Sequence, residues 1–134
     1  MKHFPILLLS LFTSAACFFT SCSEDDDLAP LFLVVTPDTT AVINVGQQQL
    51  YRIGFQTKDN QLVRNLRILS EDKNNAEKIL LDTTFNVTPS EVKYKFLKDA
   101  SYADEVILHF IATDVNGNNC RIDRNIKSPV VPTE

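Results

Sequence analysis

Apolar and polar side chains alternate at every second residue along much of this chain, and this pattern restricts it to strands. Segment 50–56 places a tyrosine, an isoleucine and a phenylalanine on one face, with polar residues or glycine on the other. The same alternation recurs at 91–97 and 104–113, and no stretch sustains the period of a helix. Short strands separated by turn residues are typical of a two-sheet antiparallel β-sandwich. The predicted fold class is therefore all-β.

Eight strands are expected, and their register also predicts the core. They lie at 31–36, 41–45, 50–56, 62–70, 78–85, 91–97, 104–113 and 120–126. Asn116-Gly117 is a strong signal for the hairpin that joins the last two. The residues expected inside are Tyr51, Ile53, Phe55, Leu66, Ile68, Tyr94, Phe96, Val106, Leu108, Phe110 and Ile122. Ile111 should lie nearer the surface than Phe110, because neighbouring strand residues face opposite sides.

The first residues form an apolar leader. Lys2 and His3 precede apolar runs at 6–12 and 15–19, and small residues follow just before Cys22. The apolar part is broken by hydroxyl residues and is shorter than the ~20 residues of a membrane-spanning helix. This arrangement predicts a cleaved signal peptide.

The end of the leader, Phe19-Thr20-Ser21-Cys22, resembles a bacterial lipobox in which Phe replaces the usual Leu. The resemblance implies cleavage before Cys22 and a lipid on its thiol, with acyl chains such as palmitate, so that the mature protein is held on a membrane. An ordinary signal peptide with a chance cysteine is the alternative. Cys17 is a poorer candidate, because apolar Phe18 and Phe19 would follow it directly.

An acidic run follows the lipobox. It consists of Ser23, Glu24, Asp25, Asp26 and Asp27. A run without apolar side chains stays solvated. Its position resembles the surface-export signal of lipoproteins in one phylum of Gram-negative anaerobes. The resemblance implies an outer-membrane protein that faces the cell exterior, and a periplasm-facing anchor is the alternative.

These features divide the chain of 134 residues into four parts. We expect a lipoprotein signal peptide at 1–21, a lipidated acidic tether at 22–30, one sandwich domain at 31–128 and a C-terminal tail at 129–134. The chain carries 17 acidic and 13 basic residues, a net charge of −4. Such a balance is unsuited to nucleic acid, which needs a clustered basic face.

Three segments resemble immunoglobulin-like domains of bacterial surface lipoproteins. They are Val42-Ile43-Asn44-Val45-Gly46-Gln47, Leu80-Leu81-Asp82-Thr83-Thr84-Phe85, and the stretch from Phe110 to Asn118. The resemblance implies an immunoglobulin-like sandwich displayed at the cell surface. It does not imply a particular ligand, because such folds carry many functions.

Few side chains are suited to chemistry. Asp114, Asn116 and Asn118 alternate like the start of a calcium loop, but Gly117 comes too early and no Glu completes it, so turn formation explains them. His109, the one histidine after the leader, is expected on an exposed or half-covered strand face. A catalytic histidine or a zinc site needs further groups nearby. We therefore predict no catalytic residue, metal or cofactor.

The cysteines give no indication of a catalytic or metal site either. Cys120 is expected in the core as a small apolar residue. With Cys17 removed and Cys22 lipidated, no intramolecular disulfide is expected in the mature chain.

The resulting hypothesis is a non-enzymatic, lipid-anchored surface module that binds a protein partner or serves as an accessory subunit. Loops 58–60 and 115–118 are the expected contact surface. The alternative is a small glycan-capture lipoprotein, although the chain has no Trp and offers only Tyr102 as a loop-tip aromatic. A hydrolase is the third hypothesis. Thr39 and Thr83 lie in Asp-Thr-Thr segments that resemble an O-glycosylation pattern of the same phylum.

Overall fold

The computed structural model describes residues 31–57, 62–102 and 104–132. The predictions for the signal peptide, for the tether with Cys22 to Asp27 and for loop 58–60 lie outside these ranges. Among the described residues, no helix has the length and hydropathy that crossing a bilayer requires.

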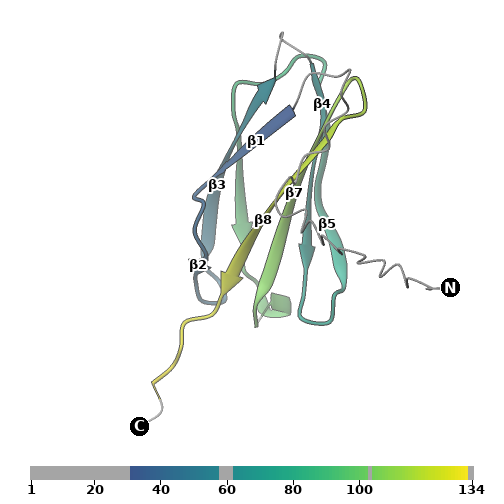
Figure 1. Ribbon diagram of the computed structural model, residues 1–134. Coiled ribbons are helices and arrows are strands. Elements are labelled where there is room, and N and C mark those ends of the chain that lie inside the picture. Colours follow the sequence, from purple (N-terminus) through teal and green to yellow (C-terminus); the bar gives the residue numbers. More distant parts are fainter. Residues whose placement is uncertain (1–30, 58–61, 103, 133–134) are drawn as a thin grey trace, which may run out of the picture.

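The described chain forms two β-sheets that face each other (Figure 1). One sheet has the order β1-β3-β6 and the other has the order β2-β8-β7-β4-β5. All neighbouring strands are antiparallel except β2, which runs parallel to β8. The strands are β1 (Leu31–Thr36), β2 (Ala41–Val42), β3 (Gln48–Thr57), β4 (Val63–Glu71), β5 (Glu77–Thr84), β6 (Val92–Leu97), β7 (Val106–Asp114) and β8 (Asn119–Lys127). The predicted all-β sandwich is confirmed.

One predicted strand is shorter than expected. The segment expected at 41–45 is a strand only at Ala41–Val42. A turn takes over after Ile43, where the Gln47 amide donates to the Asn44 carbonyl at 3.1 Å and the Gln47 side chain accepts from the Asn44 amide at 2.8 Å. Asn and Gly favour such turns and outweigh the apolar pattern.

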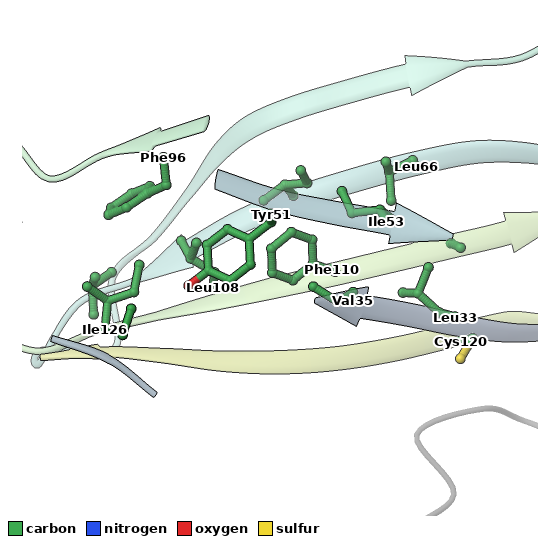
Figure 2. Packing of buried hydrophobic residues seen from close by; sticks show 14 of the residues in the cluster. Leu33, Val35, Tyr51, Ile53, Leu66, Phe96, Leu108, Phe110, Cys120 and Ile126 are labelled. Atoms are coloured by element: carbon green, nitrogen blue, oxygen red, sulfur yellow. The ribbon is translucent and has the colours of Figure 1, made fainter. Parts of the chain in front are cut away.

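The core lies between the two sheets (Figure 2). Tyr51 from β3 meets Phe110 from β7 with ring centroids 5.2 Å apart, and both side chains are fully buried. Ile111 is only partly buried, so the predicted register of β7 is confirmed. Most of the predicted core is buried, while Phe55, Tyr94 and Ile122 are partly buried and pack against its margin.

The predicted hairpin joins β7 to β8, with Gly117 at a φ of 85° that other residues adopt at a cost. Asp114 is 2% exposed and holds this turn. Its carboxylate accepts hydrogen bonds from the amides of Asn116 and Asn118, both at 2.9 Å, and from the Asn118 side chain at 2.8 Å. These donors already occupy the oxygens that a calcium ion would need, in agreement with the turn interpretation.

Two predictions about single residues are wrong. Tyr102 is not at an exposed loop tip: it ends a short 3₁₀ helix, η2 (Ala100–Tyr102), is 8% exposed, and its hydroxyl pairs with that of Ser70 at 2.8 Å. Its ring packs on Phe96, because an aromatic residue close to a sandwich edge gains by covering the core. Cys120 is buried as expected but is disulfide-bonded, whereas no disulfide was expected.

Candidate metal centre

His109 lies at the centre of the outer face of the five-stranded sheet. Its neighbours Leu108 and Phe110 point into the core, so its own side chain points away from it. The residue is nevertheless only 2% exposed. The prediction of an exposed or half-covered histidine is therefore wrong. Side chains from the two flanking strands, Glu71 of β4 and Arg121 and Asp123 of β8, contact the ring.

Both ring nitrogens of His109 face carboxylates. Nε2 lies 2.6 Å from Oε2 of Glu71, and Nδ1 lies 2.7 Å from Oδ1 of Asp123. Carboxylates only accept hydrogen bonds, so the ring nitrogen that carries the imidazole hydrogen donates it to the carboxylate it faces. The two contacts fix the orientation of the ring on the sheet.

The strands place a second glutamate beside Glu71. The turn between β4 and β5 is held by Asp72, whose Oδ1 accepts from the amides of Asn74 at 2.8 Å and Ala76 at 3.0 Å. Glu71 and Glu77 lie directly opposite each other in the antiparallel ladder, at the two ends of this turn. Like charges in that position destabilise a sheet unless something neutralises them.

A β-bulge creates this like-charge pair. Between Ile68 and Leu69 the register of β4 against β5 shifts by one residue. Without the shift, Glu71 would stand opposite Lys78, which is a favourable pair; with it, Glu71 stands opposite Glu77. Bulges commonly redirect side chains at functional sites. Here the bulge replaces a cation by a second carboxylate.

Glu71, Glu77 and His109 together form a group suited to a metal ion. Each offers one ligand atom, and these atoms lie within 4.8 Å of one another. One imidazole and two carboxylates suit borderline to hard divalent ions such as Zn²⁺, Fe²⁺ and Mn²⁺. Asp123 on the far nitrogen matches the outer carboxylate that usually orients a metal-binding histidine. The residues present therefore fit a metal ion.

Asp123 is itself held by Arg121. The Arg121 Nε donates to Oδ1 of Asp123 at 2.9 Å. Burial alone would raise the pKa of Asp123, but the hydrogen bonds and charges of Arg121 and His109 outweigh it and lower that pKa from its ordinary value. Asp123 thus stays an anion that accepts from His109 across the neutral range.

An open pocket of about 210 Å³ lies beside Glu71. It is lined by Glu71, Asp72, Lys73, Asn75, Glu105 and Ile107. Three of the four charged side chains are carboxylates, so the field in the pocket favours an approaching cation. Lys73 is paired with Asp104 at 2.6 Å, which offsets its charge and also keeps the pKa of Asp104 below its usual value.

The comparisons with known proteins concern the fold. The sequence matches no protein-family model, and no match was found among curated proteins. Among solved structures, superoxide reductase (neelaredoxin) from Ignicoccus hospitalis is similar, with a TM-score of 0.55 and 13% identity over 74% of this chain and 80% of that one. Two variants of that protein give TM-scores of 0.59 and 0.57 at 10% and 9% identity, each over 72% of this chain and 79% of theirs. The likeness shows a shared fold.

These findings contradict the predicted function. The similar structures are enzymes, and the sandwich carries a group of residues that fits a metal ion. The hypothesis of a non-enzymatic surface module, with its glycan-capture alternative, is therefore withdrawn. The physical reason for the error is that His109 was expected on an exposed or half-covered face with no carboxylate held nearby, whereas the two flanking strands place Glu71 and Asp123 against its ring.

The sequence contained a partial signal for this site. His109, Arg121 and Asp123 all occupy the outward-facing positions of strands that were expected to be adjacent through the Asn116-Gly117 hairpin. The two glutamates could not be found in this way. Glu71 lies 38 residues before His109, and its position opposite Glu77 depends on the bulge.

Proposed function

We propose that the protein binds a divalent transition-metal ion through Glu71, Glu77 and His109. The observation that carries the proposal is the pairing of two glutamates across β4 and β5 next to a buried histidine whose other nitrogen is held by Asp123. A divalent cation would neutralise the like charges that the bulge brings together. Three protein ligands leave further coordination positions for water or substrate, as in catalytic rather than structural sites.

A metal titration of the full chain tests this proposal. Isothermal titration with Zn²⁺, Mn²⁺ and anaerobic Fe²⁺ should give one site per chain and should release protons, because the hydrogen on Nε2 must leave. Glu77 is exposed, so Glu77→Gln should keep the fold while weakening the site by tenfold or more. Glu91→Gln, an exposed glutamate outside the group, is the matched control. Equal affinities for the two variants would refute the site.

Superoxide reduction is the second candidate, and the shared fold with superoxide reductases is what favours it. In this reaction one superoxide takes one electron and two protons and becomes hydrogen peroxide. A redox-active metal ion would supply the electron, and an external one-electron donor would restore it. Iron- or manganese-loaded protein should consume superoxide only when a reductant is present. Consumption that is equal in Glu77→Gln would exclude the site from the reaction.

We also propose that Cys22 carries a lipid that anchors the protein to the outer membrane, facing outward through the run Glu24 to Asp27. The lipobox-like segment supports this proposal. Lipidation of Cys22 and removal of Cys17 exclude the disulfide of Cys120 from the mature protein.

An intact mass measurement therefore distinguishes the lipidated mature chain from a chain that keeps the disulfide of Cys120. Membrane-extracted protein should lack residues 1–21 and carry acyl chains, and Cys22→Ser should lose membrane fractionation, whereas Cys17→Ser should not. A mature chain that retains the disulfide would contradict lipidation. Replacing 24–27 by alanine should abolish labelling by an external protease. The withdrawn function aside, a protein or glycan partner at the cell surface stays an untested prediction.

We further propose that the sandwich is immunoglobulin-like. The sheet orders support this: β1-β3-β6 corresponds to strands A-B-E of that fold, and β8-β7-β4-β5 corresponds to G-F-C-C′. An experimental structure with a different strand order would contradict it.

A further inference from the structure

The guanidinium of Arg121 places one of its N–H groups against the ring of His109, a member of the metal-binding group. Nη2 of Arg121 lies 2.8 Å from Nδ1 and 3.4 Å from Nε2 of His109. With a metal ion on Nε2, Nδ1 carries the hydrogen of the imidazole and donates it to Asp123, so it then has no lone pair for Arg121. Nε2 uses its remaining valence toward Glu71, or toward the metal ion that the proposed function places there. In the metal-loaded protein, therefore, neither nitrogen of His109 accepts a hydrogen bond from Nη2.

Arg121 is also held in place and accessible. Its Nε donates to Asp123 at 2.9 Å, which anchors the plane of the guanidinium. Its side chain is 45% exposed, so a small molecule can reach Nη2 from solvent. Nη2 lies 3.4 Å from the very nitrogen that would bind the metal ion. A small ligand bound to the metal therefore comes within hydrogen-bonding reach of this donor.

We propose that Arg121 selects small anions as ligands of the metal ion. This proposal rests on the proposed metal site. A guanidinium offers a fixed positive charge and directed N–H groups, which favour an anion over a neutral ligand of the same size. The carboxylates around the site would otherwise repel an anion. Arg121 thus makes a site rich in carboxylates accessible to a small monoanion, which is the chemical class of superoxide and of azide.

Azide and imidazole are the probes that test the proposal. The full chain is loaded with Co²⁺, whose visible bands report ligand exchange, and each probe is titrated separately. Arg121→Gln should weaken azide binding about tenfold and leave the binding of neutral imidazole unchanged within twofold. Arg121→Lys keeps the charge but loses the directed N–H groups of the guanidinium, so its affinity for azide should lie between those of Arg121→Gln and the unmodified protein.

Arg67→Gln is the matched control. Arg67 lies on β4, pairs with Asp82 at 3.5 Å and is 43% exposed, which is close to the value for Arg121. The Arg67→Gln variant should bind azide and imidazole with the same affinities as the unmodified protein. Equal losses of azide and imidazole in Arg121→Gln, an effect of the same size in Arg67→Gln, or loss of Co²⁺ itself from Arg121→Gln would overturn the role of Arg121. Failure of the unmodified protein to bind Co²⁺ would instead refute the metal site, and this is seen before any probe is added.

Discussion

Replacing Asp123 by Asn should weaken metal binding, although Asp123 is not one of the three proposed ligands. Its Oδ1 accepts from Nδ1 of His109 at 2.7 Å, which holds the ring with Nε2 toward Glu71 and increases the basicity of the imidazole. Loss of such an outer carboxylate typically costs 10- to 100-fold in metal affinity, or about 1.4 to 2.7 kcal/mol.

The structure places the expected effect at the lower end of this range. The Asp123 side chain is 48% exposed, so solvent screens its charge. Asparagine also keeps an oxygen that can accept from Nδ1, so the ring orientation survives and only the negative charge is lost. We therefore expect about a tenfold rise in the dissociation constant for Zn²⁺, near 1.4 kcal/mol.

A competition titration against a chromophoric chelator measures this change. Asp82→Asn is the control, because Asp82 is also 48% exposed and also pairs with an arginine of the same sheet but has no contact with the ligand group. Equal dissociation constants for the two variants would refute the outer-ligand role of Asp123. A hundredfold loss would show that the ring orientation, rather than the charge alone, depends on it.

The remaining predictions concern stability. Phe110→Ala should lower the free energy of unfolding by ~3–5 kcal/mol, out of a total of ~5–15 kcal/mol for such a domain, and replacing the partly buried Ile111 by Ala should cost less. Urea denaturation followed by circular dichroism ranks the two variants, and the reverse order would refute the register of β7. Tyr102→Phe should cost about 1–3 kcal/mol in the same assay, because it leaves the buried Ser70 hydroxyl without its bond, and no loss would contradict that contact. Because the folded pKa of Asp123 is lowered, its contribution to stability is present above the unfolded pKa of about 3.9 and disappears as the pH falls through the folded value. Melting temperatures measured from pH 6 to pH 2 should therefore fall less steeply for Asp123→Asn than for the unmodified protein, and parallel curves would argue against this linkage.

The sandwich could be predicted because each strand carries its own alternation. In β7, Leu108 and Phe110 face the core and Ile111 does not, as their sequence positions require. The site could not be predicted in the same way. Burial of His109 depends on long polar side chains from β4 and β8, and a period of two says only that the residue faces outward. The prediction of an exposed Tyr102 was wrong for a related reason, since a loop position does not reveal that the ring packs on Phe96.

The bulge between β4 and β5 links the core to the proposed chemistry. On one side of it Ile68 is fully buried in the core, and on the other side Glu71 faces Glu77 on the outer face. The hydrophobic face fixes the register of β4 against β7, because a slip by one residue would expose Ile68 and Leu66. The position of Glu71 beside His109 follows from that register. The position of Glu77 follows from the one-residue shift against β5. A sandwich with an uninterrupted ladder would pair Glu71 with Lys78, so the extra residue in β5 is what brings the second carboxylate of the proposed metal site opposite Glu71.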